Sequence, residues 1–378
     1  MTFWENLALA FKGEGGPVRP PLGRSYIGTY GGAALSGDVP FSYEAKVRSA
    51  YIDNAIAQRA VRIVAEAVGS ASITGTQDDA TTLLRKGGSQ PLLETVSAHL
   101  LLHGNAYVQI IGDGEHMVDE LYALRPDRIT IETDAKGWPI AYQYRAGEHV
   151  DRFPACDEMG RPAVLHIRAF HPTDDHYGLG CLGAAANAVS VHNAAAKWNK
   201  AFLDNAARPS GALVFDPGPD GSVLTSEQFD RLKAEMEASF AGSGNAGRPM
   251  LLEGGLKWQS MSMTPADMDF VALKEAAARE IALAFGVPPM LLGLPGDNSY
   301  ANYREANRAL WRLTILPLAG KILNSLSGAL SNWWADTKLE IDRDQIPALS
   351  EDRERLWKQV SEADFLSPEE KRAMLGIE

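Results

Sequence analysis

Two long helical segments, each followed by residues that cannot continue a helix, constrain the fold of this chain more than any other feature. The first is expected over 184–206 and ends before Pro209. The second is expected over 266–285 and ends at Gly286, just ahead of the pair that begins with Pro288. Proline lacks the backbone N–H that extends the hydrogen-bond ladder, and glycine favours helix C-termini. The two helices must therefore enclose whatever lies between them as an insertion.

The insertion itself has a mixed pattern. A β-type run, GALVF, starts at Gly211, and Thr225 or Ser226 is placed to cap a helix that continues to about Phe240. The segment MLLEGGLKWQSMSM, 250–263, predicts a hairpin. The sequence therefore predicts a strand, a helix and a hairpin between the two long helices.

The rest of the chain predicts an α+β fold. Apolar residues recur at helical spacing over 49–68, including Ile52, and a shorter helix is expected over 92–102. A third long helix begins near Asn302 and is kinked by Pro317. A small, mostly antiparallel sheet is expected from short β-type runs at 105–112, 120–126, 128–134, 140–146 and 163–170, with a later strand at 337–344 and a charged helical tail from 350.

Composition excludes several function classes. The chain has 378 residues and a net charge of −12, which opposes a tight grip on nucleic acid because duplex affinity comes mainly from Lys and Arg. Its two cysteines, Cys156 and Cys181, are too few for a disulfide framework. The start places Trp4 and Phe11 on one helical face but lacks the features of a signal peptide. No stretch is expected to approach the roughly 18 apolar residues that cross a bilayer, so a soluble protein is predicted.

A glycine motif raises the question of nucleotide binding. Gly178, Gly180 and Gly183 have the spacing G-x-G-x-x-G ahead of a helix. The preceding strand ends near Phe170, however, and the acidic residue at the right distance, Asp204, lies within the same helix rather than after a second strand. We favour a close turn that starts a helix against a sheet; a nucleotide-binding enzyme using these glycines remains the alternative.

Other chemical motifs are weak. His99 and His103 have a metal-binding spacing but lack the accompanying Glu of H-E-x-x-H. No P-loop and no G-x-S-x-G motif is present, so we expect no catalytic centre, no cofactor and no ATPase activity in this chain. The densest group of polar side chains lies in and beside one loop, where a metal site remains an alternative. Its members are His166, His171, Asp174, Asp175 and His176.

The segment from Glu280 to Leu318 resembles the most recognisable stretch of tailed-phage portal proteins of the lambdoid long-tailed type, which includes portals of prophages and gene transfer agents. It reads EIALAFGVPPMLLGLPGDNSYANYREANRALWRLTILPL. HGNAYVQII, LRPDRITIE, HPTDDHYGLGCLGAA, NAARPSGAL and LSPEEKRAMLGIE extend the resemblance over most of the chain. Residues before Phe41 show no such resemblance, and the short length implies a reduced C-terminal crown.

The resemblance implies a homo-oligomeric, dodecameric ring at the portal vertex of a virion or virus-like particle, assembled in the bacterial cytoplasm. Double-stranded DNA would pass through its tunnel without sequence specificity. The implied protein partners are the major capsid protein, a head-tail adaptor and the terminase large subunit, with no role for a membrane. A lining of net-negative subunits would repel phosphates at short range.

The resemblance also divides the chain. It implies an N-terminal arm (1–40), a wing (41–183), a first stem helix (184–206), a clip (207–263), a second stem helix (264–286), a tunnel loop (287–301), a long kinked helix with a return strand (302–348) and a short crown (349–378). Three sets of site residues follow from it: a loop tip facing DNA (Leu294, Pro295, Gly296, Asp297, Asn298, Ser299), a loop anchor (Met290, Leu291, Leu292), and a clip tip that contacts adaptor and motor (Gly242, Ser243, Gly244, Asn245).

Overall fold

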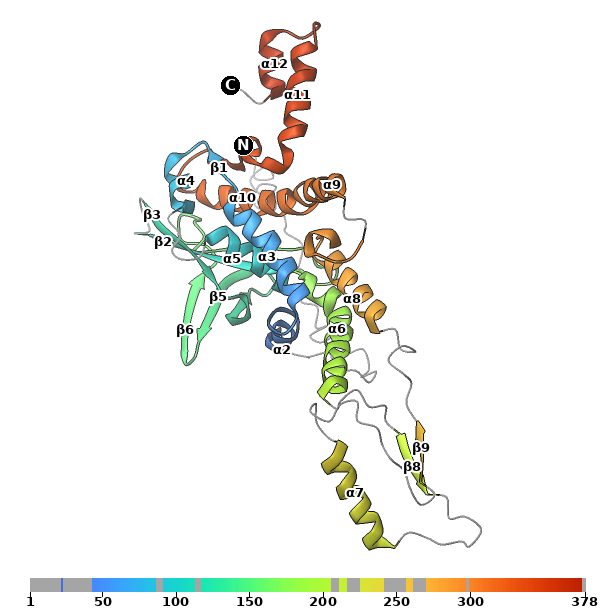
Figure 1. Cartoon of the computed structure of the whole chain (residues 1–378). Helices are drawn as coiled ribbons and strands as arrows, with labels where there is room; N and C mark the ends of the chain where they lie inside the picture. Colours follow the sequence, from blue (N-terminus) through green and yellow to red (C-terminus); the bar gives the residue numbers. More distant parts are fainter. Residues whose placement is uncertain are drawn as a thin grey trace, which may run out of the picture. The chain divides into compact units, whose positions relative to one another are not determined.

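The computed structural model describes residues 22, 43–85, 91–112, 117–204, 211–215, 225–240, 256–260, 270–296 and 299–375 (Figure 1). The chain divides into two compact units. The first includes Val61–Gly183 and Arg308–Glu378, and the second includes Asp38–Ala60 and Ala184–Asn307. The combination of helices and antiparallel strands confirms the predicted α+β class.

The first unit is built around short antiparallel sheets rather than the single sheet expected. In one, β2 (Asn105–Gly112) lies between β3 (Val118–Leu124) and β7 (Val164–Arg168). In the other, β4 (Ile129–Thr133), β5 (Pro139–Ala146) and β6 (His149–Pro154) form a meander. A third pairs β1 (Ile73–Gly75) with β10 (Leu339–Ile341).

Both three-stranded sheets contribute to one core. Its buried members alternate along the strands, as expected for sheets with one face covered, and are Tyr107, Leu124, Ile129, Ile131, Tyr142 and Val164. The helices of this unit include α4 (Asp78–Arg85) and α5 (Leu92–His103). α5 ends at Gly104, which adopts the left-handed conformation with φ 81° and leads directly into β2.

A long helix over 300–330 consists of three segments. They are α9 (Tyr300–Leu310), a π-helical turn at Trp311–Ile315, and α10 (Leu316–Leu330). The π-turn ends two residues before Pro317, whose missing N–H and ring disturb the hydrogen bonds of the turn before it. The C-terminal part forms α11 (Ser350–Glu362) and α12 (Pro368–Leu375), which confirms the helical tail.

This helix corrects the expectation that no segment would be long and apolar enough to cross a bilayer. Among the described residues, Tyr300–Leu330 is sufficient by length and composition, with a mean hydropathy of 1.3 in its most apolar window. Core helices meet the same criterion, and Ile322, Leu326 and Leu330 of α10 are completely buried. Its apolar composition therefore has an explanation in packing within the protein.

The second unit begins with α2 (Tyr43–Val47) and a π-helical turn at Arg48–Ile52. The predicted single helix over 49–68 is wrong, because the chain breaks at Asp53-Asn54 and α3 (Ala55–Ser70) begins afresh. The Asn54 Oδ1 atom accepts hydrogen bonds from the N–H groups of Ile56 and Ala57 at 3.1 and 3.0 Å. Asn54 thus caps α3. Ile52, expected on the buried face, is 64% exposed.

The long helices and the insertion of this unit follow the expected order. α6 (Cys181–Asp204) and α8 (Phe270–Ala284) enclose α7 (Ser226–Phe240) and two strands. β8 (Gly211–Phe215) pairs antiparallel with β9 (Leu256–Ser260), so the described part of the predicted 250–263 hairpin pairs instead with a strand about forty residues earlier. Thr225 and Gln228 bond reciprocally in a capping box at the start of α7.

Asn54 is expected to stabilise the second unit strongly. It is 1% exposed and also donates to Asn193 of α6 over 2.9 Å, so Asn54→Ala removes a helix cap and a buried side-chain hydrogen bond. We expect a loss of about 2–3 kcal/mol in the free energy of unfolding, measured by chemical denaturation. Thr225→Ala, which removes the exposed cap of α7, serves as the control and should cost about 1 kcal/mol or less. Equal losses in the two variants would contradict this role.

Candidate functional site

The predicted tunnel loop begins with a tightly closed helix end. Gly286 has φ 65°, its N–H donates to the carbonyl of Leu283 over 3.0 Å, and the N–H of Val287 donates to Ala282 over 2.9 Å. This pair of bonds is a Schellman motif, in which a glycine in the left-handed region closes the helix. Val287 is 2% exposed, so the first residue after this closure is buried. The expected stop at Gly286 is confirmed.

A second turn ends at a glycine in the left-handed region, Gly293, seven residues after Gly286. After Pro288, a 3₁₀ turn covers Pro289–Leu292 and ends at Gly293 with φ 74°. The N–H of Gly293 donates to Met290 over 3.1 Å, and the N–H of Leu294 donates to Pro289 over 3.3 Å. The proposed anchor residues Met290, Leu291 and Leu292 are half-buried. The start of the loop is therefore a compact unit defined by its backbone.

An arginine that the sequence analysis did not select holds the next part of the loop. Arg279 of α8 donates from Nη2 to the carbonyl oxygen of Pro295 over 2.7 Å, and its Nη1 lies 3.7 Å from a carboxylate oxygen of Glu275. The loop tip is thus attached to the helix that precedes it. No sequence signal marks Arg279, because the contact depends on the folded path of the loop.

The tip of the loop is only partly described. Leu294 is half-buried, whereas Pro295, Gly296 and Ser299 are exposed. Asp297 and Asn298 lie outside the described residues, as do Gly242, Ser243, Gly244 and Asn245 of the predicted clip tip. Ser299 caps α9 by accepting a hydrogen bond from the N–H of Asn302 at its Oγ over 3.2 Å. The loop therefore has a fixed beginning and a fixed end.

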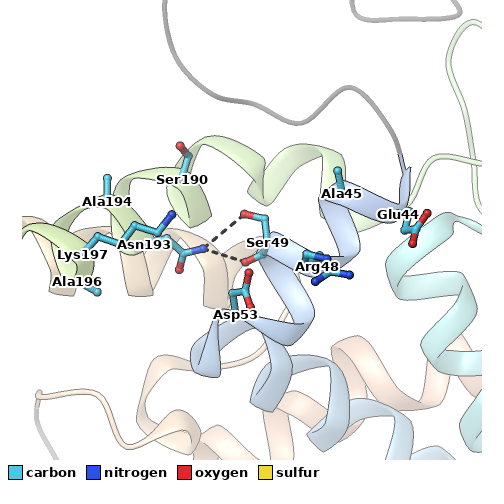
Figure 2. Close-up of a pocket in the computed structure, with 10 residues that line it drawn as sticks. All are labelled: Glu44, Ala45, Arg48, Ser49, Asp53, Ser190, Asn193, Ala194, Ala196 and Lys197. Atoms are coloured by element: carbon cyan, nitrogen blue, oxygen red, sulfur yellow. Dashed lines mark hydrogen bonds between the residues drawn. The ribbon is translucent and has the colours of Figure 1, made fainter. Parts of the chain in front are cut away.

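A groove lies between the α2 segment and α6, within the second unit (Figure 2). Its volume is about 620 Å³. The side chain of Asn193 connects the two walls, because its Nδ2 donates to the Ser49 carbonyl over 2.9 Å. Arg48 lies between Glu44 and Asp53 on the first wall in Figure 2. The α6 wall contributes Ser190, Asn193, Ala194, Ala196 and Lys197.

The glycine motif forms a close contact between backbones. A Cβ atom at Gly178 would clash with the carbonyl oxygen of Gly104, and one at Gly180 would lie 2.6 Å from the carbonyl oxygen of Leu102. The end of α5 therefore fills the space that a nucleotide phosphate would need beside these glycines. This supports the interpretation as a close turn, and the nucleotide-binding alternative is not supported.

Asn105 is the polar centre of this contact. It is 1% exposed; its Oδ1 accepts the N–H of Gly178 over 2.7 Å, and its Nδ2 donates to the Gly178 carbonyl over 3.2 Å. The same Oδ1 lies 3.0 Å from Nε2 of His166, whose ring stacks on Tyr107 with centroids 4.3 Å apart. Asn105 thus joins the turn to the central sheet through paired hydrogen bonds.

The residues considered as metal ligands in the 166–176 segment have other contacts. His176 bonds through Nε2 to the carbonyl of Gly137 over 2.6 Å, and His171 accepts the N–H of Thr173 over 3.2 Å. Asp174 accepts the N–H of His176 over 2.7 Å and so shapes the turn. Asp175 accepts a bond from Arg168 at its carbonyl. Across the described residues, no group of three or more His, Cys, Asp or Glu side chains is arranged to hold a metal ion.

Burial dominates the titration of three histidines. It lowers the pKa of His99 and His103 to about 4, with the mutual charge of the pair lowering the pKa of His99 further. Burial and the nearby Arg168 lower the pKa of His166 to about 3. In the second unit, burial and then the charge of Lys274 lower the pKa of His192. The first three are therefore neutral structural groups at pH 7.

Comparison with known proteins gives a consistent result. The model of the phage portal protein family matches residues 55–376. An uncharacterized protein of Rickettsia bellii (strain RML369-C) is 39% identical over 364 residues, which cover 90% of this chain and 91% of the relative. Among solved structures, a chain in the virion of a native gene transfer agent particle is 43% identical with a TM-score of 0.70, covering 99% of this chain and 98% of that chain.

A second solved structure similar to this chain was determined with a stated rotational symmetry. It is the neck of a native gene transfer agent particle computed with C12 symmetry. The matching chain is 45% identical with a TM-score of 0.70, and the match covers 91% of this chain and 95% of that chain.

Gly178 and Gly183 offer a matched pair of substitutions. Gly178→Ala should cost about 3 kcal/mol of unfolding free energy, because the new methyl group would overlap backbone atoms, including the carbonyl oxygen of Gly104. Gly183→Ala should be neutral or stabilise by up to about 0.5 kcal/mol, since it lies in α6 with its nearest neighbour 3.8 Å from the new Cβ. Thermal or urea unfolding measures both. Similar values for the two would show that the close approach is unimportant.

The buried histidines predict a dependence of stability on acid pH. Because their folded pKa values lie below the unfolded value of about 6.5, the unfolded chain binds more protons as pH falls below 6.5. Their contribution is fully present above pH 6.5 and declines toward pH 4, by up to about 1.4 kcal/mol per pH unit for each histidine. His166→Gln, which can still donate to Asn105, should reduce this slope by one histidine's share.

Urea titrations between pH 7.5 and pH 4.5 measure the slope for the parent and the variant. His149→Gln provides the control, because the side chain of His149 is 75% exposed. The control should retain the parent's slope. If His166→Gln also retains it, burial of His166 does not contribute to acid sensitivity.

Proposed function

The chain belongs to the phage portal protein family, and we propose that twelve copies form a ring through which double-stranded DNA is packaged into a capsid and ejected from it. The match over nearly the whole length to a chain of a gene transfer agent virion, at 43% identity, is the observation that carries this proposal. The C12 symmetry of the related neck supports the copy number. The portal protein is a component of the particle, at the vertex where head and neck meet.

The proposed ring guides DNA rather than binding it tightly. Each subunit has a net charge of −12, and duplex affinity depends on cations that release counterions from phosphates. We assign the contact with DNA to the tip of the 287–301 loop, from Leu294 to Ser299. Its start is fixed by the closures at Gly286 and Gly293, and Arg279 holds Pro295. These contacts would keep twelve tips at a constant position around the bore.

The protein partners follow from the same function. The family is structural and this sequence contains no P-loop, so a terminase large subunit would supply the motor and no cofactor is required. We assign contacts with that motor and with the head-tail adaptor to the clip, 207–263, and contacts with the major capsid protein to the rim of the ring. The described elements within 207–263 are the α7 helix and the β8–β9 pair.

Ring formation tests the proposal directly. The purified chain, and particles that contain it, should show rings with twelvefold symmetry in negative-stain images and the mass of a dodecamer in solution. A particle neck from which this chain is absent, together with a purified chain that remains monomeric at micromolar concentration, would contradict the proposal.

Cations at the loop tip should slow DNA passage. Asp297→Lys combined with Asn298→Lys would add phosphate contacts from every subunit, so DNA packaged per particle should fall at low salt and recover at high salt. The matched control, Asp119→Lys with Thr130→Lys, adds the same charge at exposed positions of β3 and β4. Packaging equal to the parent at both salt concentrations would show that this loop does not line the tunnel.

A further inference from the structure

One face of α8 is exposed although it is largely apolar. Leu273 and Leu283 are 45% and 79% exposed, and Ala276 and Glu280 lie between them at helical spacing on the same face. The opposite face is buried through residues that include Ala277, Ile281 and Phe285. Exposed leucines on a rigid helix, with one acidic residue among them, are typical of a surface covered by another protein.

The groove in Figure 2 is a complementary surface on the same unit. Small residues of α6, Ala194 and Ala196, leave room for larger side chains, and Lys197 is the only charged residue of the α6 wall. Asn193 fixes the distance between the walls through Ser49 and accepts a hydrogen bond from buried Asn54. Hydrogen bonds of the protein itself therefore join the two walls of the groove.

We propose that the exposed face of α8 docks in this groove on the next copy of the chain, with Glu280 of one copy paired with Lys197 of its neighbour. The inference rests on the proposed function, because a closed ring needs two different surfaces that fit each other. Glu280 is opposite in charge to Lys197. The large side chains of Leu273 and Leu283 fit the space that the small Ala194 and Ala196 leave in the groove. Each copy presents both surfaces, so the contact repeats around the ring and covers the α8 face and the groove of every copy.

The charges of the groove favour Lys197 over Arg48 as the partner. Arg48 lies between two acidic residues of its own wall, Glu44 and Asp53, whereas the described residues of the α6 wall include no acidic residue beside Lys197 (Figure 2). Lys197 and Glu280 are both exposed, and within the described part of the chain neither has an ion-pair partner within 4 Å. Arg279, beside Glu280, is already engaged by Glu275 and Pro295. Glu280 is thus the acid of this face that remains available.

Charge reversal tests the pairing. In rings of Glu280→Lys every interface would bring two cations together, and in rings of Lys197→Glu two anions. We expect each variant alone to form at least about tenfold fewer rings than the parent at low salt, because juxtaposed like charges strongly disfavour association. A 1:1 mixture of the two variants should recover rings, since alternating subunits restore opposite charges at every interface and twelve is an even number. The double variant should recover them as well.

The mixture separates contacts between copies from contacts within one copy. A pair within one chain would be restored in the double variant but not in the mixture, and that result would overturn the inference. Single variants that form rings as well as the parent would also overturn it. Glu227→Lys, a reversal at an exposed position of α7, is the control and should leave ring formation unchanged. If the parent itself forms no rings, the proposed function fails and this inference with it.

A second measurement does not depend on charge. With Cys156 and Cys181 replaced by serine, Ala276→Cys and Ala194→Cys in one chain should form disulfides between neighbours under mild oxidation. Denaturing gels would then show a ladder of covalent multimers up to the full ring. Rings that yield only monomers on such gels would place α8 away from the groove, while leaving the proposed function intact.

Discussion

The first unit depends on a contact between two backbones that only glycine permits. The turn at Gly178 and Gly180 lies against the end of α5 at Gly104, and a methyl group at either turn position would meet main-chain atoms. Asn105 then bonds to both the N–H and the carbonyl of Gly178, as a neighbouring strand would. This contact fixes where α6 begins. The same spacing of glycines that suggests a nucleotide site therefore serves the packing of the protein on itself.

Local signals in the sequence predict much of the fold, because strand periodicity and helix ends are encoded by neighbouring residues. The runs at β2, β4 and β5, the end of α8 at Gly286, and a cap of α7 at Thr225 or Ser226 were all predicted in this way. Features that depend on distant partners were missed. Asn54 ends one helix and starts another because Asn193 and His192 lie beside it, and β9 pairs with a strand far back in the sequence. The residues around Ile52 contain no local signal that predicts the break between the two helices at Asp53-Asn54.

The candidate site shows the same division. The limits of the loop after α8 follow from glycine and proline chemistry, and the structure agrees at Gly286. The attachment of Pro295 to Arg279 does not follow, since an arginine on a helix surface has many partners available to it. The groove was also unpredictable, because the sequence suggested one continuous helix where a π-turn and Asn54 create a separate wall. A surface formed by two segments about 140 residues apart in the sequence exists only in the folded chain.

The acidity of the chain and the chemistry of the loop act over different distances. Electrostatic effects are screened beyond about 8 Å at physiological ionic strength, so the net charge of a ring acts on DNA only where the wall comes close. Wherever the bore is wider than this, overall acidity contributes little to the movement of DNA. In the proposed ring, the residues that reach the phosphates would then determine friction, and the backbone hydrogen bonds from Gly286 to Pro295 would determine which residues those are. Backbone hydrogen bonds and Arg279 set the position of this loop. The residues at its tip can therefore be substituted without changing how far the loop extends from α8.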